Sequence, residues 1–378
     1  MKTGTTFIIS LTAILTLAAG SAFGKYSGGS GTAGAPYRIA TKANLLALAA
    51  DTGDYGKCFI LTADINMTGQ IFAGAIIAQN TITDTYFQGT YFTGTFDGNG
   101  HKITNFTIKN VVTYSFVGLF GYINAGSVKN LGIEDCSVSG YYYAGCLAGY
   151  NNDGTISNCY SKGTVSGVSN SFYTGGLAGY NSGSISDCHS TGSVSGVSDS
   201  SFVGGLVGNN DGDISKCYAA GSVSASEIVG GLVGVNGSSS SSINNCYSTG
   251  SVSGSYNVGG LVGYHNNGSI SDCYSTGAVS GSSPVGGLVG YHYSGGVVSS
   301  FWDTNTSGQT TSAGGTGKTT AQMKRTSTFA DWDFIGSWGI IENQTYPYLM
   351  TGLDGDLNHD KKVDFTDFAI FADNWLTQ

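Results

Sequence analysis

Charged side chains are scarce in this sequence: 10% of its 378 residues are Asp, Glu, Lys or Arg, whereas 40% are hydrophobic and 23 are Tyr. Disordered chains are usually rich in charge and poor in aromatic residues, so this composition predicts a folded chain. The few charges sum to −9 at pH 7, which argues against nucleic acid or an anionic membrane as a partner.

Long hydrophobic runs are missing except at the N-terminus. There, Lys2 precedes an apolar run from Phe7 to Ala19, and Ala22-Phe23-Gly24 has the small-x-small form of a cleavage site. The run is too short to cross a membrane as a helix, and together these features predict a signal peptide over residues 1–24. No other stretch is apolar for long enough, so we expect an exported protein that is soluble or attached to a surface, with no membrane span after signal removal.

Apolar stretches of helix length are also absent from the centre of the chain, where short segments repeat instead. From about Val117 to Val298 a pattern recurs seven times, with a Gly-Gly-Leu-Val-Gly core, an Ile-Ser-x-Cys-Tyr-Ser segment and a Gly-Ser-Val-Ser-Gly segment. Its leucine returns every 26 to 30 residues, at Leu119, Leu147, Leu177, Leu206, Leu232, Leu261 and Leu288. A fixed period of this size is typical of stacked supersecondary units.

Each unit holds three short segments rich in β-branched residues, Ser and Gly, which favours strands over helices. One unit cannot bury its own inner face, but a stack of units can. We therefore predict an all-β fold, a parallel β-helix with three short strands per turn, which we expect to be right-handed. A β-propeller blade needs about 40–45 residues, and a leucine-rich repeat carries several Leu per unit, so both alternatives fit less well. Ile156 and Cys159 both have the character of core positions although three residues separate them, so we expect a corner between them.

Five of the eight cysteines follow the same period, at Cys159, Cys188, Cys217, Cys246 and Cys273. Stacked rungs are about 4.8 Å apart, a separation that disulfides tolerate, although parallel side chains make the torsions difficult. Three interpretations are open: reduced thiols that fill the core, one or more disulfides, or metal ligands. Leu131 takes the cysteine's place in the first unit, which favours the core-filling interpretation.

The repeats resemble the GLUG-motif family of extracellular, repetitive bacterial proteins that are predicted to be β-helical. The residues that carry the resemblance are Gly204-Gly205-Leu206-Val207-Gly208, Cys217-Tyr218 and Gly221-Ser222-Val223-Ser224, with their counterparts in the other units. About half of the chain is covered. The resemblance implies an architecture but no activity, because the motif carries no known chemistry.

The segments on either side of the repeats are expected to close the stack. Residues 25–96 resemble the lead-in found before GLUG repeats, and Lys42 to Ala50 is its best helix, with Thr41 as N-cap. The repeat block itself is assigned to residues 97–298. Residues 299–352 leave the pattern, and their aromatic residues predict a second cap. An uncovered rung would otherwise expose unpaired strand edges.

Residues 353–378 differ in character because acidic residues occur there in a 12-residue frame. Asp356, Asn358, Asp360, Asp364 and Asp367 occupy positions 1, 3, 5, 9 and 12 of a calcium loop, and the carbonyl of Lys362 supplies position 7. Hard oxygen ligands at this spacing let one loop surround one Ca²⁺. With Asp at position 12, the loop resembles a dockerin half-repeat, and the following segment looks like the tails of exported planctomycete-type proteins. The resemblance implies a cohesin-like partner. Lys361 stands where such loops have Gly, and only one copy is present, so that partnership is in doubt.

The repeats contain few residues that could carry out acid–base catalysis. Only nine charged residues lie between Gly140 and Ser300, and none is Arg, whereas polysaccharide lyases and hydrolases need clustered carboxylates. His265 and His292 fall at matching positions in adjacent units, where we weigh a shared metal against polar stacking at the surface and favour the latter.

Aromatic residues are the better functional candidates. One outward column is predicted from residues that follow the cysteines, namely Tyr160, His189, Tyr218, Tyr247 and Tyr274. A second is predicted from Tyr150, Tyr180, Tyr264 and Tyr291. Exposed aromatic rows bind sugars and protein partners, and the alternative is ladder stacking for rigidity. We therefore expect an exported, non-enzymatic binding or adhesion protein that contacts a polysaccharide or a cell-surface protein. The alternatives are a polysaccharide lyase or glycoside hydrolase, and a structural cell-surface spacer.

Overall fold

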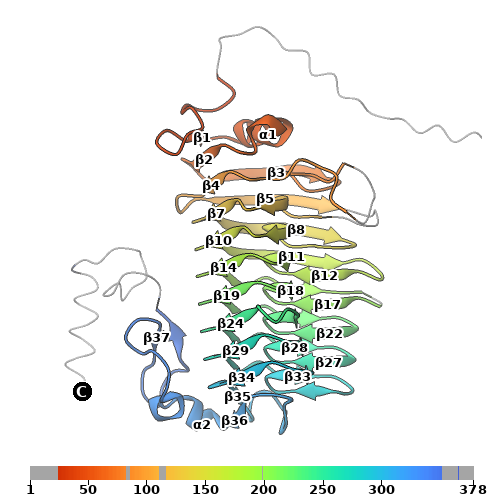
Figure 1. Ribbon diagram of the computed structural model, residues 1–378, viewed down its shortest axis with the longest axis vertical. Coiled ribbons are helices and arrows are strands. Elements are labelled where there is room, and N and C mark those ends of the chain that lie inside the picture. The colour runs from red at the N-terminus through yellow and green to blue at the C-terminus, as the bar shows by residue number, and fades with distance from the viewer. Residues whose placement is uncertain (1–23, 82–85, 110–115, 198, 351–364, 366–378) are drawn as a thin grey trace, which may run out of the picture.

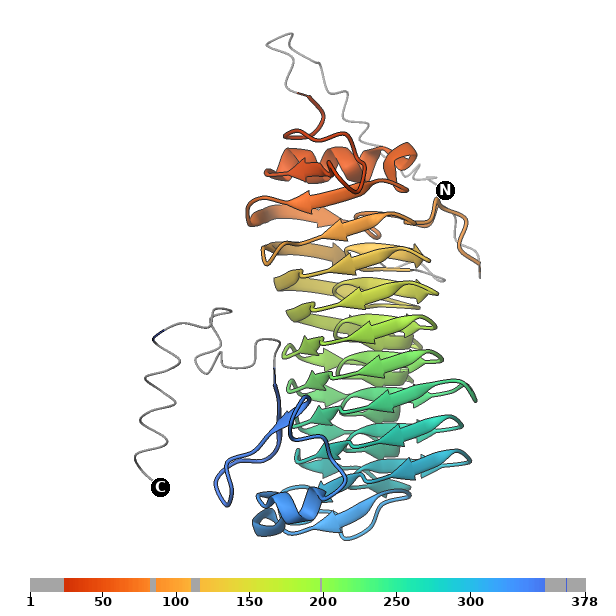
Figure 2. The ribbon, with the colours of Figure 1, turned by 60° about the vertical axis from the view of Figure 1, so that its left-hand side comes forward.

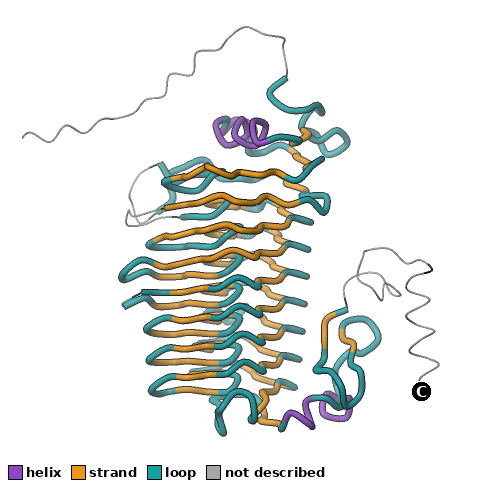
Figure 3. The backbone as a smooth tube through the Cα atoms, turned by 180° about the vertical axis from the view of Figure 1, so that it is seen from behind, coloured by secondary structure: helices purple, strands orange, loops and turns teal. Residues whose placement is uncertain are grey.

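The computed structural model describes residues 24–81, 86–109, 116–197, 199–350 and 365. The chain winds into a parallel β-solenoid of about seven regular turns, in which each strand pairs in parallel with its counterpart one turn away (Figure 1). Among the described residues, helices lie at the two ends of the stack and strands fill its body (Figure 3). The predicted stacking of successive units, one flat on the next, is confirmed.

Four parallel sheets form the walls of the solenoid. The ten-stranded sheet contains β1 (Tyr37–Ile39), β2 (Cys58–Leu61), β4 (Thr95–Asp97), β7 (Ser127–Lys129), β10 (Thr155–Ser157), β14 (Ser184–Ser186), β19 (Asp213–Ser215), β24 (Ser242–Asn244), β29 (Ser269–Ser271) and β34 (Gly296–Val298). The five-stranded sheet contains β12 (Phe172–Gly175), β17 (Ser201–Gly204), β22 (Glu227–Gly230), β27 (Tyr256–Gly259) and β32 (Val285–Gly286). The seven-stranded sheet contains β6 (Phe120–Asn124), β9 (Ala148–Asn152), β13 (Ala178–Asn181), β18 (Val207–Asn210), β23 (Val233–Asn236), β28 (Val262–His265) and β33 (Val289–His292).

The fourteen-stranded sheet changes along the solenoid. Its N-terminal half has long strands, β3 (Ile65–Phe72), β5 (Lys102–Lys109), β8 (Gly132–Gly140) and β11 (Tyr160–Gly167). In later turns two short strands replace each long one: β15 (His189–Ser190) and β16 (Val194–Ser195), β20 (Tyr218–Ala219) and β21 (Val223–Ser224), β25 (Tyr247–Ser248) and β26 (Val252–Ser253), β30 (Tyr274–Ser275) and β31 (Val279–Ser280). The sheet ends with β35 (Phe301–Asp303) and β36 (Thr316–Lys318).

The Gly-Gly-Leu core bends more sharply than the sequence indicated. The segment from Phe202 to Val207, one of the three short segments of its unit, is divided between β17 and β18, which belong to different sheets. A Cβ on Gly205 would lie 2.1 Å from the carbonyl oxygen of Gly231 in the next turn, so only glycine fits at this bend. The strands of one turn therefore contribute to four sheets.

The interior is built from columns of identical residues. Ile156, Ile185, Ile214, Ile243 and Ile270 pair in register along the ten-stranded sheet, and all five are fully buried. The corner expected between Ile156 and Cys159 is present at Asn158, whose φ is 50°. Asn and Asp tolerate this left-handed conformation better than most residues, and one residue per turn adopts it here.

Both ends of the solenoid are covered. At the N-terminal end α1 (Lys42–Ala50), followed by the 3-10 turn Thr52–Asp54, places Leu45 and Leu48 in the core. The side chain of Thr41 accepts a hydrogen bond from the amide of Asn44, which confirms it as the N-cap. At the other end Trp302 is buried on the last turn.

Residues 320–350, here called the C-terminal arm, continue from that end and turn back along the outside of the solenoid (Figures 1 and 2). The arm contains α2 (Thr320–Met323), the 3-10 turn Thr326–Phe329, and the antiparallel pair β37 (Trp338–Gly339) and β38 (Tyr348–Leu349). It thus covers part of one wall in addition to closing the stack.

Candidate functional site

The predicted aromatic column exists on the outer face of the fourteen-stranded sheet. Tyr160, His189, Tyr218, Tyr247 and Tyr274 pair in register from turn to turn. Their ring centroids are 4.6 to 5.2 Å apart and neighbouring planes differ by at most 7°. Because the rings lie flat against one another along the solenoid axis, most ring faces are already covered. A sugar would therefore meet ring edges and hydroxyls here, and the stacking also gives this column the rigidity that was its alternative role.

The C-terminal arm covers the lower half of this column. Tyr274 is only 2% exposed, and Trp338 packs against both Tyr247 and Tyr274, with ring centroids 6.1 and 6.0 Å away. The hydroxyl of Tyr274 donates a 2.6 Å hydrogen bond to the carbonyl oxygen of Pro347. The expectation of a column exposed along its whole length is therefore wrong at Tyr274, because the chain supplies its own aromatic partner there.

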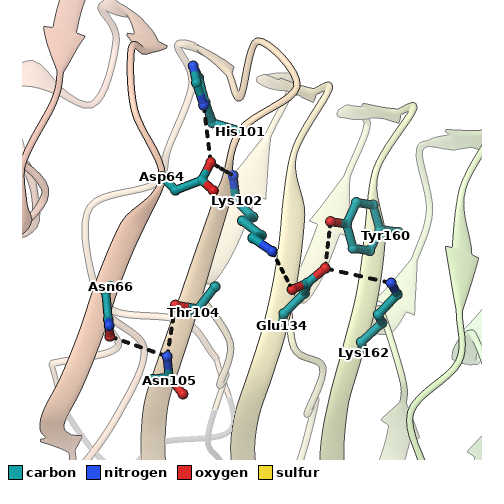
Figure 4. A network of polar contacts seen from close by, with 9 residues as sticks. All are labelled: Asp64, Asn66, His101, Lys102, Thr104, Asn105, Glu134, Tyr160 and Lys162. Atoms are coloured by element: carbon teal, nitrogen blue, oxygen red, sulfur yellow. Dashed lines mark hydrogen bonds and ion pairs between the residues drawn. The ribbon is translucent and has the colours of Figure 1, made fainter. Parts of the chain in front are cut away.

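A polar cluster lies at the other end of the column (Figure 4). Glu134 accepts hydrogen bonds from Nζ of Lys102 at 2.8 Å and from the hydroxyl of Tyr160 at 2.9 Å, and Nζ of Lys162 is 3.6 Å from its Oε1. One turn further, Oδ1 of Asp64 lies 3.1 Å from Nδ1 of His101. The scarcity of charged residues between Gly140 and Ser300 gave no sign of this cluster, because Asp64, His101, Lys102 and Glu134 precede that part of the chain.

The electrostatics of the cluster favour a stable ion pair between Lys102 and Glu134 over a role in proton transfer. The hydrogen bond from Lys102 lowers the pKa of Glu134, with a smaller contribution from Tyr160. Burial and the neighbouring Glu134 raise the pKa of Tyr160 to about 12, so the phenol keeps its proton. Both carboxylate oxygens of Glu134 are engaged, whereas a general base needs a free oxygen and a pKa near the working pH.

The second predicted column is interrupted. On the seven-stranded sheet, Tyr122, Tyr150 and Tyr180 stack in register with centroids 4.9 and 4.6 Å apart. The next two turns place Asn209 and Val235 at this position, and aromatic residues return only at Tyr264 and Tyr291, 5.4 Å apart. Tyr150 and Tyr180 thus belong to one group and Tyr264 and Tyr291 to another.

A row that the sequence did not reveal lies beside Tyr122, Tyr150 and Tyr180. Phe116, Tyr143, Tyr173 and Phe202 stack with neighbouring centroids 4.7 to 5.2 Å apart and planes within 20°. Tyr173 and Phe202 have φ values of 55° and 59°, which turns their side chains outward. Each of these residues stands two positions before the first Gly of the segment that carries the repeated Leu, and this shared position is the sequence signal that could have revealed them.

The two rows form one surface, here called the aromatic face: Phe116, Tyr122, Tyr143, Tyr150, Tyr173, Tyr180 and Phe202. Rings of one row meet those of the other edge to face, for example Tyr143 and Tyr150 at 5.4 Å and 67°, and Tyr173 and Tyr180 at 5.4 Å and 73°. Edge-to-face contact is a preferred geometry for aromatic pairs. The result is a rigid lattice that is half-buried, apart from the buried Phe116.

His265 and His292 do stack, with centroids 5.0 Å apart, but His265 is fully buried and not at the surface as expected. It ends a ladder of interior amides in which Asn151, Asn181, Asn210 and Asn236 hydrogen-bond in turn at 2.8 to 2.9 Å. Burial lowers the pKa of His265 to about 4, so it is neutral. In the described ranges no group of three or more His, Cys, Asp or Glu is placed to hold a metal ion.

The cysteine column consists of free, buried thiols: Cys159, Cys188, Cys217, Cys246 and Cys273. Burial raises the pKa of Cys159 well above its usual value, and the same holds for Cys188, Cys217 and Cys246. Of the three interpretations, the structure bears out core-filling thiols. A disulfide does form elsewhere, between Cys136 and Cys146, and it ties β8 to the Gly-x-Leu bend of the following unit.

The calcium-loop residues Asp356, Asn358, Asp360, Lys362, Asp364 and Asp367 lie outside the described residues, as does nearly all of the predicted signal peptide. Calcium binding and the dockerin-like tail remain predictions. Among the residues that the structure does describe, none belongs to a helix with the length and apolar character needed to cross a membrane.

Comparison with known proteins supports the resemblance of the repeats to the GLUG motif. The family model of the GLUG motif matches five stretches, residues 140–166, 170–195, 200–224, 225–253 and 254–280. Halomucin from Haloquadratum walsbyi is 33% identical over 159 residues, which is 40% of this chain, and the chain spans about 2% of that relative's length. The repeats are thus GLUG motifs, as their resemblance implied.

The fold is similar to that of a solved structure. A protein from Bacteroides ovatus, described as a candidate immunoglobulin A1 protease, aligns with a TM-score of 0.57 over 87% of this chain and 96% of its own, at 20% sequence identity. At that identity the likeness concerns the β-solenoid and not the activity.

Proposed function

We propose that this protein is an exported, non-enzymatic β-solenoid that binds a polysaccharide or a cell-surface partner through outward aromatic residues. The observation that carries the proposal is the aromatic face, where six of the seven stacked rings from successive turns remain partly exposed on a rigid wall. Half-exposed aromatic clusters mark interaction sites on soluble proteins, and a preformed surface loses little conformational freedom on binding.

Export is supported by two independent features. The N-terminal sequence has the pattern of a signal peptide, and the disulfide between Cys136 and Cys146 is of a kind that persists in oxidising compartments. We extend the proposal to the C-terminal tail: a Ca²⁺-binding loop at Asp356 to Asp367 would serve for attachment, with a cohesin-like module as its partner.

Polysaccharide cleavage is the alternative that the cluster around Glu134 favours. Lys102, Lys162 and Tyr160 surround this single carboxylate, and donors of these types can orient an acidic sugar. Their engagement with Glu134 itself is the reason that binding is preferred over catalysis.

The proposal is tested with the mature protein on a glycan array and on intact bacterial and plant cell walls. Specific retention on a glycan or wall supports binding, and retention on none leaves only a structural spacer. Release of reducing sugars or unsaturated products from plant and algal polysaccharides, abolished by Glu134→Gln, would establish the enzyme instead.

A further inference from the structure

The chemical groups exposed on the aromatic face limit the class of ligand that it can bind. We propose that it is the ligand-binding site of this protein and that its ligand is a neutral polysaccharide; this inference rests on the proposed function and assigns it a place and a substrate class. The hydroxyls of Tyr122, Tyr143 and Tyr173 are the groups that make the contact.

These three hydroxyls are available. Within the described part of the chain, none of them forms a hydrogen bond to another residue, whereas the hydroxyl of Tyr180 donates to Asp211 and that of Tyr160 to Glu134. Burial raises the pKa of Tyr122, Tyr143 and Tyr173 above that of a free phenol. They therefore keep their protons and can both donate to and accept from sugar hydroxyls.

The same hydroxyls are held in fixed positions. The ring of Tyr143 is sandwiched between Phe116 at 4.7 Å and Tyr173 at 5.2 Å. The ring of Tyr122 is stacked on Tyr150 at 4.9 Å with parallel planes. Because neighbouring rings prevent rotation of the side chains, a ligand would not have to order them on binding. Tyr122, Tyr150 and Tyr180 occupy three rungs, so at about 4.8 Å per rung this row spans about 10 Å, the length of about two sugar residues laid along the axis.

The ring packing also argues against an apolar partner. Stacking within each row covers the ring faces of Tyr143, Tyr150 and Tyr173, so edges and hydroxyls are what a ligand meets. A hydrophobic protein surface would gain little buried apolar area there. A polymer rich in hydroxyl groups matches the donors and acceptors that remain.

The charges beside the face select against an acidic ligand. The carboxylates that act on Tyr122, Tyr150 and Tyr173 belong to Asp153 and Asp211, and no Lys or Arg among the described residues contributes to their electrostatics. A uronic acid or sulfated polymer would meet negative charge with no cation to pair with it. The lysines of this protein that lie near aromatic rings in the repeats, such as Lys162 at Tyr160, are on a different sheet.

The test compares the mature protein with the triple variant Tyr122→Phe, Tyr143→Phe, Tyr173→Phe. Each substitution removes a hydroxyl with no protein partner and keeps the ring, so the melting temperature is expected to stay unchanged. Binding is measured by affinity electrophoresis against neutral polymers (β-glucan, mannan, galactan) and acidic ones (polygalacturonate, alginate). Three lost hydrogen bonds predict roughly 10- to 100-fold weaker binding to the neutral polymer. The matched control, Tyr218→Phe with Tyr247→Phe, removes two hydroxyls from the other column and should bind as the unaltered protein does.

The outcomes separate the inference from the proposed function. Weaker binding of the triple variant at an unchanged melting temperature supports the inference. Unaltered binding of the triple variant, or a preference of the unaltered protein for acidic polymers, overturns it while the binding function stands. Self-association that the triple variant abolishes would assign the face to contact between copies and also overturn it. If the unaltered protein binds no polysaccharide or wall, the proposed function itself fails.

Discussion

The indole N–H of Trp338 donates a 2.8 Å hydrogen bond to Oδ1 of Asn245, and this contact fastens the C-terminal arm to the wall of the solenoid. Asn245 is one of the corner residues with positive φ, so its amide points away from the core and is available to the arm. The arm follows the last turn, yet it docks beside Tyr247, two turns back along the stack. The described part of the arm, which ends at Met350, therefore lies along the side of the solenoid and not at its tip.

Replacement of Trp338 should release the arm and leave the solenoid folded. Trp338 is fully buried and makes the arm's contacts with Tyr247 and Asn245, and truncation of a buried Trp to Ala costs about 3–5 kcal/mol. Limited proteolysis of Trp338→Ala is expected to cut within residues 320–350 much faster, while far-UV circular dichroism stays unchanged. Ile335→Ala is the control, because Ile335 is 90% exposed in the same arm; equal cleavage rates for the two variants would contradict a docked arm.

The thiols should divide into two classes. Five of the six free cysteines are buried in the core column, and Cys58 is half-buried near the N-terminal end. Because the five buried thiols are shielded from solvent, the native protein should react rapidly with one equivalent of a thiol reagent. Six equivalents are expected after unfolding without reductant, and eight after reduction of the disulfide. Cys58→Ser should remove the fast reaction, and two or more fast equivalents in the native protein would show that the column is open.

How far the sequence predicts the structure depends on whether a feature repeats. The Leu and Cys positions recur at nearly constant spacing. Their stacking, and a corner between Ile156 and Cys159, could therefore be predicted directly from the sequence. The bend at Gly205 did not, because glycine in a pattern does not show that a backbone oxygen of the next turn occupies the Cβ position. The disulfide between Cys136 and Cys146 lies off the repeat, so its pairing could not be read from periodicity.

The functional surfaces were predicted less completely for the same reason. The residues after the cysteines were correctly placed in one outward column, since alternation along a strand fixes their side. Tyr143 and Tyr173 were missed because a strand pattern does not reveal the left-handed backbone that turns Tyr173 outward. The burial of Tyr274 was missed because it depends on Trp332 and Trp338, far along the chain and outside the repeats.

Calcium binding by the tail is tested by removing one carboxylate from the predicted loop. Asp356 would occupy position 1, and affinity in such loops depends on the number of charged oxygen ligands. Asp356→Ala should weaken Ca²⁺ binding by at least about tenfold in isothermal titration calorimetry. Asp373→Asn removes an acidic group from the same tail but outside the loop, and should leave the titration unchanged. Absence of binding heat in the unaltered protein would remove the calcium assignment.

Acid should weaken the solenoid through the buried His265 and the half-buried His189. Burial lowers the pKa of His265 from 6.5 to about 4, so between these values the unfolded chain binds a proton that the folded chain does not. The stabilising contribution is therefore fully present above pH 6.5 and declines as the pH falls toward 4. For His265 alone the loss amounts to about 2 kcal/mol at pH 5. Burial lowers the pKa of His189 to about 4 in the same direction.

The residues at equivalent positions in other turns suggest the substitutions that test this acid sensitivity. His265→Asn continues the amide ladder that runs from Asn151 to Asn236, and His189→Tyr gives the aromatic column the residue that it has in its other turns. Chemical denaturation at pH 7.5 and pH 5 should show a smaller loss of stability in each variant than in the unaltered protein, and the smallest loss in the double variant. His101→Asn is the control, since His101 is part-exposed beside Asp64 and is not buried in a column. A double variant as acid-sensitive as the unaltered protein would show that the carboxylate pairs, such as Glu134 with Lys102, set the response instead.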